Sequence, residues 1–463
     1  MFAIFGVSDW AARLPSAVDT TLMVIAIYWF LRKFRPGFHL DGALLTAAAA
    51  GVIGFARAAS TDTPLAATFT LAMLAWYAWH ESGAKAYLAL SYAALALGAL
   101  AKGPVAPFLA LAILVVFAAA QRDYRMIRRT LWIPGILLFC AIALPWYIAV
   151  QMRNPEFFRV FILEHNLARF GTNLYRHKEP FWYYIPVVLL GLVPWAVFAI
   201  AALVETVRAW WAERREVFQP EDALNIFLVI WLVVPAAFFS ISQSKLPGYI
   251  LPALPAGTVL VAEHLRRRLT EGDRPGILMV SLHSILAAAP MVPALMIQSM
   301  VLYHRLSWST ATAISCAAAA VLAIGIAVTL RAQFGPGALR LVAMVPVVLI
   351  VAAVLRLGAP ALDSALSARP LALEISRMES TRLPLAVFRV PRQTEYGLAF
   401  YRDQAIDRYE SGRIPAGEHL VVAPKGSQTE VAQQVEGRRV SYLGSFAPQG
   451  LDYYWVAAQK SGQ

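Results

Sequence analysis

Long apolar runs alternate with short polar connections along most of the chain. The runs are about 18 to 25 residues long, and a helix of that length crosses a hydrocarbon core of roughly 30 Å. The pattern predicts an all-α polytopic membrane region with about twelve transmembrane helices. The runs lie at residues 14–31, 41–57, 64–80, 86–102, 104–120, 131–151, 181–203, 223–241, 247–264, 276–302, 308–330 and 338–358.

The composition agrees with a membrane protein. Of the 463 residues, 59% are hydrophobic and 15% are charged, which nearly excludes a soluble cytosolic enzyme. The formal net charge is +12, but the positions of the basic residues indicate topology rather than binding of nucleic acid. Cys140 and Cys316 both lie inside apolar runs, so a disulfide framework is not indicated.

Basic residues cluster in the connections after alternate apolar runs. The clusters lie at residues 32–35, 122–129, 208–215 and 266–274. By the positive-inside rule these connections are cytoplasmic. Counting from them places the start of the chain and the tail after about Ala359 on the external side of the membrane.

An external start needs an element that carries it across the membrane. Met1 to Arg13 has neither a basic stretch nor an apolar stretch suited to a signal peptide. We therefore expect at least one helix upstream of Met1 that is absent from this sequence. An inverted or odd-numbered topology is the alternative.

The tail of the chain changes character. Between Asp363 and Gln463, charged and polar residues are interleaved among short runs typical of β-strands, with one helical stretch. We therefore predict two domains, a transmembrane domain at residues 1–360 and a small soluble α/β domain at residues 361–463. The strand-like runs are residues 384–390, 419–422, 439–443 and 453–457, and the helical stretch is residues 394–406.

Ionisable residues at the external ends of the apolar runs are the first candidates for a functional site, because such groups are costly near a membrane. Arg57 and Asp62 lie in Arg57-Ala-Ala-Ser-Thr-Asp62-Thr-Pro, between the second and third runs. Lys102 lies in Ala-Lys-Gly-Pro between the fourth and fifth runs, where a lone ammonium suits an anionic ligand. The alternatives are a helix start capped by Thr63, with Asp62 favouring the helix dipole, and simple interfacial snorkelling of Lys102.

The polar segment at residues 153–180 is the longest between the apolar runs. It has an apolar face at helical spacing and a polar face, which predicts an amphipathic helix in the membrane interface. This helix presents His165 and Arg169 on the same side of the membrane as Lys102. The alternative is that the helix is only an anchor.

A second external segment, residues 240–252, forms a tight turn leading into a proline-rich helix. Lys245 and Tyr249 lie one helical turn apart and could together donate hydrogen bonds to a phosphate oxygen. The external elements could thus surround one anionic group near the bilayer surface. A lipid phosphate is the obvious candidate.

These segments, in this order, resemble the membrane glycosyltransferases that use a polyprenyl-phosphate sugar. The group includes the lipid A aminoarabinose transferase and the dolichyl-phosphate-mannose protein mannosyltransferase relatives. The resemblance covers about the first 260 residues. It rests on Ser8 to Ser16, Arg57 to Pro64, Lys102 to Pro104, His165 to Phe170, His177 to Tyr184 and Lys245 to Pro252.

The resemblance implies a GT-C fold with its catalytic site at the external face. On that analogy Lys102, Arg169 and Tyr249 hold the donor phosphate, Asp62 belongs to the catalytic centre, and His165 lines it. Lys245 and Arg57 are lesser candidates for substrate binding. The group's usual Asp-Glu pair on the first external loop and the Lys-Pro-Pro segment that follows it are not present here. We therefore expect the chain as given to lack its principal base, which leaves open that this form is inactive.

The function expected from the resemblance is transfer of one sugar from a polyprenyl (undecaprenyl) phosphate to an external acceptor, by direct displacement with inversion. The acceptor is lipid A, another glycolipid or glycan, or a protein, and the other partners are membrane lipids. The expected location is the bacterial inner membrane, with the active site on the periplasmic face. Two alternatives remain: a transporter or flippase for lipid-linked sugars, and a non-catalytic scaffold that binds lipid phosphate.

Metal involvement is not assigned from the sequence. Glu164 and His165 alone do not form a convincing ligand set. A divalent cation is left open, and no other cofactor is indicated.

Overall fold

The computed structural model describes residues 1–161, 179–213, 220–301 and 308–459. Its contacts divide the chain into two compact units. The larger unit contains residues 13–289 and 319–348, and the other contains residues 1–12, 290–318 and 349–463. The predicted domain boundary near residue 360 stays a prediction.

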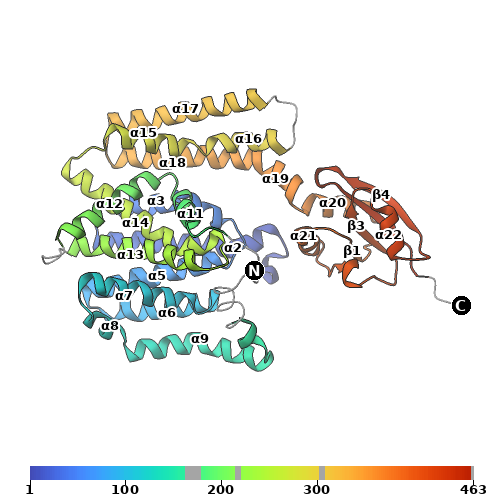
Figure 1. The fold of residues 1–463 in the computed structure, drawn as a ribbon, viewed down its shortest axis with the longest axis horizontal. Coiled ribbons are helices and arrows are strands. Elements are labelled where there is room, and N and C mark those ends of the chain that lie inside the picture. The colour runs from blue at the N-terminus through green and yellow to red at the C-terminus, as the bar shows by residue number, and fades with distance from the viewer. Residues whose placement is uncertain (162–178, 214–219, 302–307, 460–463) are drawn as a thin grey trace. The chain divides into compact units, whose positions relative to one another are not determined.

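Each apolar run predicted from the sequence forms one helix or two successive helices where the structure describes it, with short non-helical breaks such as residues 48–49 and 192–195. Figure 1 shows most of these helices in the larger unit, with colours from blue to orange that follow the chain. They are α2 (Asp9–Phe34), α3 (His39–Ala47), α4 (Ala50–Ala56), α5 (Asp62–Ser82), α6 (Lys85–Lys102), α7 (Val105–Gln121), α8 (Arg125–Thr130), α9 (Ile133–Arg153), α11 (Tyr184–Gly191), α12 (Ala196–Glu213), α13 (Pro220–Ile241), the 3-10 helix η2 (Pro247–Ala253), α14 (Leu254–Glu271), α15 (Ile277–Ala288), α17 (Trp308–Ala332) and α18 (Pro336–Ala353), of which α2, α17 and α18 also reach into the other unit.

The multi-pass membrane character is confirmed, but the predicted number of spans is not. Among the described residues, six helical segments are long and apolar enough to cross a membrane, or up to eight if each bent pair forms one span. The bent pairs are α3 with α4, at 64°, and α11 with α12, at 114°. The helix α7 is apolar but has only 17 residues, and charged residues at the end of α14 lower its apolar content.

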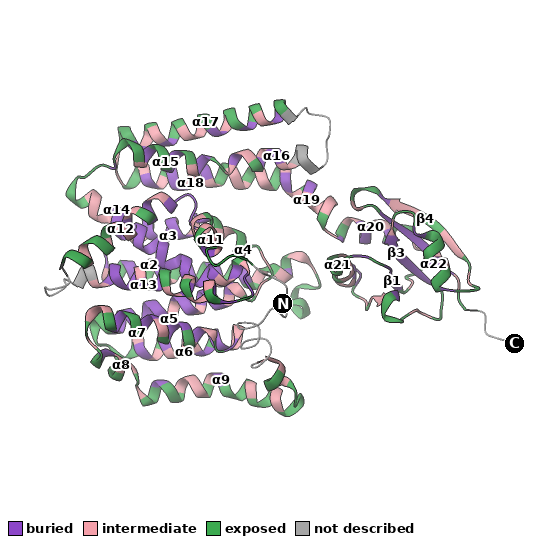
Figure 2. Cartoon of the chain, viewed as in Figure 1, coloured by how far each residue is buried: buried purple, intermediate pink, exposed green. Residues whose placement is uncertain are grey.

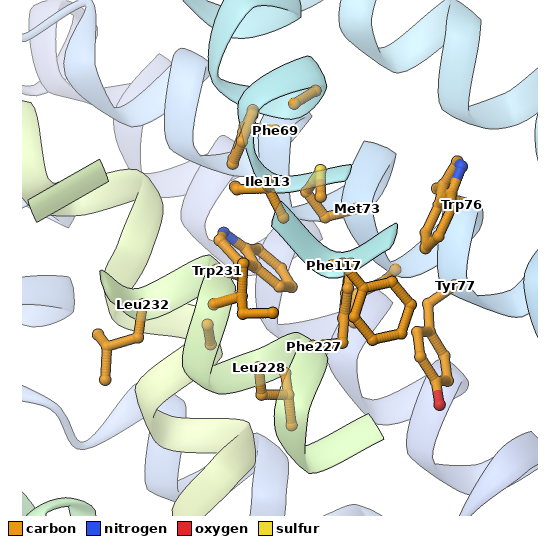
Figure 3. Packing of buried hydrophobic residues seen from close by; sticks show 14 of the residues in the cluster. Phe69, Met73, Trp76, Tyr77, Ile113, Phe117, Phe227, Leu228, Trp231 and Leu232 are labelled. Atoms are coloured by element: carbon orange, nitrogen blue, oxygen red, sulfur yellow. The ribbon is translucent and has the colours of Figure 1, made fainter. Parts of the chain in front are cut away.

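An aromatic core joins α5, α7 and α13. Trp76, Phe117 and Phe227 are buried, and the ring of Phe227 lies 5.5 Å from that of Trp76 and 5.3 Å from that of Phe117, between centroids. Figure 3 shows these side chains pointing toward one another between the helices, and Figure 2 shows the same region as buried. The packing of these large rings fixes the position of α5. Because α5 begins at Asp62, the same packing positions the Asp62 side chain.

Small residues bring α6 close to its neighbours near the external end. A Cβ atom built on Gly98 would lie 3.0 Å from the Cβ atom of Ala106 and 3.1 Å from Oγ1 of Thr68. Close helix approach at small residues is the usual way in which membrane helices pack. Gly98 is one turn before Lys102, so this contact holds the end of α6 against α5 and α7.

The other unit contains a five-stranded sheet with helices around it (Figure 1). The strand order is β2-β1-β3-β5-β4, in which β1 is parallel to β2 and β3, and β5 is antiparallel to β3 and β4. The elements are α1 (Phe2–Phe5), α16 (Met291–Val301), η3 (Val354–Gly358), α19 (Ala359–Leu366), α20 (Arg369–Met378), β1 (Leu385–Val387), α21 (Arg392–Arg402), β2 (Asp407–Arg408), η4 (Tyr409–Ser411), β3 (His419–Pro424), α22 (Gln428–Gln434), β4 (Val440–Phe446), η5 (Ala447–Gln449) and β5 (Leu451–Val456).

The predicted α/β character of the tail is confirmed. Each of the four predicted strand runs contains or overlaps an observed strand, and the predicted helix overlaps α21. The strand β2 was not predicted, because it has only two residues and no alternating pattern can be read from so short a segment.

The first residues of the chain pack against this α/β unit. Tyr401 donates a hydrogen bond of 2.7 Å to a carboxylate oxygen of Asp9, and the other oxygen lies 3.6 Å from the guanidinium of Arg369. The rings of Phe2 and Phe400 are 6.0 Å apart. Asp9 is the first residue of α2, so these contacts tie the start of that helix to α20 and α21.

Candidate active site

Asp62 begins α5 after the short loop that follows α4. Its Oδ2 atom accepts a hydrogen bond of 2.8 Å from the hydroxyl of Ser60, and its own backbone N–H donates to that hydroxyl at 3.1 Å. The hydroxyl of Thr63 instead donates to the carbonyl of Phe55 at 3.2 Å. Thr63 therefore does not cap the helix, while Asp62 does lie in the first turn, where a carboxylate favours the helix dipole.

Lys102 forms an ion pair with Asp62. The ammonium of Lys102, at the last residue of α6, contacts Oδ1 of Asp62. The side chains are 26% and 17% exposed, so the pair is partly shielded from solvent but still reachable. The same ammonium lies 4.6 Å from the ring centroid of Tyr249, in cation–π geometry.

The 3-10 helix η2 brings Tyr249 to this pair. Its backbone lies directly against Asp62, because a Cβ atom built on Gly248 would lie 2.5 Å from Oδ2 and 2.8 Å from Cγ of Asp62. The position has no room for a side chain unless the carboxylate or the helix moves. The structure thus unites three of the residues singled out from the sequence: Asp62, Lys102 and Tyr249.

Lys245 fixes the turn that leads into η2. It is 6% exposed, and its ammonium donates to the carbonyls of Ser242, at 2.6 Å, and Glu179, at 3.1 Å. The buried hydroxyl of Tyr184 donates to the carbonyl of Leu246 at 3.0 Å and accepts from the backbone N–H of Leu246 at 3.2 Å. Two hydrogen bonds of the ammonium thus go to the main chain, and a direct bond from Lys245 to a phosphate stays a prediction.

The remaining predicted site residues are Arg57, His165 and Arg169. Arg57 directly follows α4 and is exposed. His165 and Arg169 lie outside the described residues, so their predicted roles stay predictions, and the amphipathic helix expected at residues 153–180 is described only in part. Over the described ranges, no group of three or more His, Cys, Asp or Glu side chains is placed to hold a metal ion.

Two residues of the site were not predicted from the sequence. Ser60 orients the Asp62 carboxylate, and Gly248 lets η2 approach it. A serine two positions before an aspartate at a helix start commonly makes a local side-chain-to-backbone hydrogen bond. Its presence in the sequence therefore does not indicate a functional site. Gly248 stands between two prolines in Leu-Pro-Gly-Tyr-Ile-Leu-Pro, where a turn alone explains a glycine.

Residues 1–148 match the family described as dolichyl-phosphate-mannose-protein mannosyltransferase. The whole chain superposes on the crystal structure of ArnT from Cupriavidus metallidurans bound to undecaprenyl phosphate, with a TM-score of 0.77 and 21% sequence identity, over 100% of this chain and 87% of that one. The chain has the ArnT fold. The apo form of the same protein matches with a TM-score of 0.74 and 20% identity, over 98% of this chain and 85% of that one.

Curated relatives agree with the structural match. An undecaprenyl phosphate-alpha-4-amino-4-deoxy-L-arabinose arabinosyl transferase of Pseudomonas aeruginosa (strain UCBPP-PA14) is 32% identical over 279 residues, which is 58% of this chain and 48% of the relative. The transferase of the same description from Aeromonas hydrophila subsp. hydrophila is 30% identical over the same shares. The chain therefore spans about half, 48%, of the length of the curated relatives it matches. The resemblance drawn from the sequence motifs is confirmed.

Proposed function

We propose that the chain is an integral-membrane glycosyltransferase that moves a sugar from a polyprenyl phosphate to an acceptor outside the cytoplasmic membrane. The observation that carries the proposal is the meeting of Asp62, Lys102 and Tyr249 at one partly exposed point of an ArnT fold. The relatives are named for use of an undecaprenyl phosphate sugar, and the matched crystal structure holds undecaprenyl phosphate. The proposed location is the bacterial inner membrane, with this site on its periplasmic face.

The proposed donor site is built around Lys102. The phosphate of the donor carries more negative charge as the bond from the sugar to its oxygen breaks, and a fixed ammonium stabilises that charge. Tyr249 keeps the ammonium in place through its ring and can offer its hydroxyl to the phosphate. Arg169 is proposed as the third residue that binds the phosphate.

Asp62 is the proposed carboxylate of the catalytic centre. In a direct displacement, an acceptor oxygen attacks the anomeric carbon, the carbon–oxygen bond to the phosphate breaks, and the proton of the acceptor passes to a base. A phosphate that pairs with Lys102 competes with Asp62 for the ammonium, which releases the carboxylate toward the acceptor. Ser60 keeps the carboxylate from turning away.

The acceptor is proposed to be an external hydroxyl or phosphate, of which lipid A is the first candidate. A flippase would need charged groups along a path to the cytoplasmic side. In the parts of the chain that the structure describes, two charged groups at the predicted cytoplasmic ends pair locally, Arg35 with Glu81 and Arg268 with Asp273. This arrangement favours a site open to one side, as an enzyme of this class needs.

Binding of undecaprenyl phosphate to the purified chain in lipid nanodiscs tests the donor site. Lys102→Ala removes a charge-assisted hydrogen bond, and we expect a loss of about 1.5–3 kcal/mol, or roughly ten- to hundredfold in Kd. Lys85→Ala, at the opposite end of the same helix, is the matched control and should bind as the unchanged chain does. Equal Kd values for all three proteins would refute the donor site.

Sugar transfer tests the catalytic proposal separately. Membranes containing the chain are supplied with a polyprenyl-phosphate sugar and lipid A, and the product is followed by mass spectrometry. Transfer that is lost in Asp62→Asn, while Kd for the lipid phosphate is kept, supports catalysis. Movement of the lipid-linked sugar across the membrane without transfer supports the flippase, and binding with neither supports the scaffold.

A further inference from the structure

The short helix α8 carries a cluster of arginines at the predicted cytoplasmic side of the membrane. Arg125, Arg128 and Arg129 are exposed, and their spacing of three and four residues places them on one face of the helix. Arg122, also exposed, comes directly after α7. Figure 1 shows α8 where the chain passes from α7 to α9. The 17 residues of α7, about 25 Å of helix, separate this cluster from Lys102.

The opposite face of α8 is fixed to the neighbouring helices. The side chain of Met126 is buried. The indole N–H of Trp76 on α5 donates to the hydroxyl of Thr130 at 3.1 Å, and the phenol of Tyr92 on α6 donates to the carbonyl of Thr130 at 2.7 Å. The Thr130 hydroxyl in turn donates to the carbonyl of Met126 at 3.0 Å. These contacts hold α8 against α5 and α6, so its arginine face keeps one direction, away from them.

The positive charge of the cluster is not balanced within the part of the chain that the structure describes. There, none of the four arginines forms an ion pair with a carboxylate. The neighbouring Asp123 accepts a hydrogen bond of 3.1 Å from the backbone N–H of Arg125. Like charges three or four residues apart on a helix repel one another. The arrangement therefore favours the binding of an anion, which would relieve the repulsion.

Other basic residues at the predicted cytoplasmic ends do have carboxylate partners. Arg35 lies 2.9 Å from a carboxylate oxygen of Glu81, and Arg266 lies 3.0 Å from one of Glu263. The positive-inside rule explains why all these residues lie on one side of the membrane, but it does not explain why the α8 arginines lack such partners. Guanidinium groups bind phosphate through paired N–H groups, so a phosphate suits the cluster.

The residues beside the cluster indicate that this phosphate belongs to a lipid. Tyr124, Leu131 and Ile133 are exposed, although all three are apolar or aromatic. The ring of Trp132 lies 5.6 Å from the ammonium of Lys85, measured to its centroid. Tyrosine and tryptophan are frequent where a membrane protein crosses the membrane surface. In a chain that spans a membrane, these residues meet the bilayer and place the arginines at the level of its head groups.

We propose that the arginine face of α8 binds the head-group phosphate of an anionic phospholipid, such as phosphatidylglycerol, in the adjoining leaflet. The site is separate from the proposed function, because its ligand is a lipid of the bilayer and neither the donor nor the acceptor. A zwitterionic phospholipid binds less well, since its head group also carries a positive charge. The bound lipid neutralises the repulsion along α8 and thereby stabilises the connection between α7 and α9.

The site is located by a phosphatidylglycerol that carries a photoreactive diazirine on its head group. The purified chain is placed in nanodiscs of equal parts phosphatidylcholine and phosphatidylglycerol with a trace of this probe, irradiated, and mapped by mass spectrometry. We expect labels on the peptides that contain residues 122–133. Native mass spectrometry of the chain in detergent, with phosphatidylglycerol added, measures the affinity.

Arg128→Gln combined with Arg129→Gln should lose the label and weaken binding of phosphatidylglycerol about tenfold or more, because each basic residue at an anionic surface contributes about fivefold. Arg32→Gln combined with Arg331→Gln is the matched control, since it removes two exposed arginines of the same predicted side outside the cluster. The control should keep label and affinity. Arg128→Lys combined with Arg129→Lys keeps the charge and should restore most of the binding.

Thermal unfolding separates loss of binding from loss of the fold. In nanodiscs of phosphatidylcholine alone, the glutamine variant should unfold at the same temperature as the unchanged chain or a higher one, because it lacks the like-charge repulsion. Addition of phosphatidylglycerol should raise the unfolding temperature of the unchanged chain and of the control, but not that of the glutamine variant. A glutamine variant that is stabilised as much as the unchanged chain would overturn the proposal.

Three further results would overturn it. An equal loss of affinity in the control would show that binding follows net charge rather than this cluster. Phosphatidylcholine that binds as tightly as phosphatidylglycerol would show that the head-group charge is not recognised. Displacement of the bound lipid by inorganic phosphate would assign the arginines to a free anion. None of these measurements uses sugar transfer or Lys102, so the proposed function is tested independently.

Discussion

Gly248→Ala tests how closely η2 must approach Asp62. The added Cβ atom would lie 2.5 Å from Oδ2 and 2.8 Å from Cγ of Asp62, and 3.0 Å from Cε1 of Phe55. Atoms do not approach so closely, so either the carboxylate leaves Lys102 or η2 moves away and takes Tyr249 with it. Overpacking of this kind costs typically about 1–3 kcal/mol of stability.

The effect on transfer should exceed the effect on folding. A displacement of about 1 Å at a reacting group can lower a rate by roughly a hundredfold, so we expect Gly248→Ala to reduce sugar transfer about ten- to hundredfold. Thermal unfolding of the purified chain measures the stability loss, and the transfer assay with lipid A measures the rate. Gly54→Ala is the matched control, because a Cβ atom there meets nothing within 4 Å.

A double-mutant cycle identifies the cause. If the clash is with the Asp62 carboxylate, Asp62→Ala removes most of it, and Gly248→Ala should then destabilise the chain much less than it does alone. If the stability losses of Gly248→Ala and Asp62→Ala add up in the double variant, the added methyl group does not clash with the Asp62 carboxylate. Transfer by Gly248→Ala at the rate of the unchanged chain would refute the reasoning about the site geometry.

Three further predictions follow from other contacts. Lys245→Met removes two hydrogen bonds to main-chain carbonyls and should lower the free energy of unfolding by about 1–3 kcal/mol; an unchanged unfolding midpoint would mean that the bonds are not made. Burial is the main cause that lowers the pKa of His419 in the folded chain, and the nearby positive charge of Arg438 lowers it further. His419 therefore binds a proton more readily in the unfolded chain than in the folded one. The stability that His419 contributes should therefore be complete above the ordinary histidine pKa of about 6.5 and fall as the pH drops below it, and His419→Gln should flatten this dependence in thermal melts; an equally steep dependence in the variant would exclude His419 as its source. Tyr401→Phe removes the hydrogen bond to Asp9 and should increase hydrogen exchange at the start of α2, whereas unaltered exchange would show that this contact does not hold the helix.

Most of the helical architecture was predictable from the sequence because it depends on local information. A run of about twenty apolar residues is helical in a membrane whatever its neighbours are, since its backbone groups must bond within the segment. The α/β character of the tail was predictable for a similar reason, from short alternating runs and turn residues. The number of about twelve spans stays a prediction, because six helical segments among the described residues, or eight with the two bent pairs, are long and apolar enough to cross a membrane.

The candidate site was predictable only as a set of separate residues. Asp62, Lys102 and Tyr249 each stood out as polar groups at the external end of an apolar run, but their meeting depends on how α5, α6 and η2 pack. The same packing gave Lys245 two main-chain partners. The supporting roles of Ser60 and Gly248 had no signal in the sequence, because a small residue beside a carboxylate is informative only once its distance is known.

The sequence by itself determined that this protein crosses a membrane in helices, that its tail forms a small α/β unit, and which charged groups lie at the external surface. Burial of apolar runs and the cost of charge in a bilayer act on each segment separately, so the linear pattern is sufficient for these features. Only the tertiary structure decided that the carboxylate of Asp62, the ammonium of Lys102 and the phenol ring of Tyr249 lie together. Those features depend on distances between segments far apart in the chain, which are fixed when the helices pack against one another.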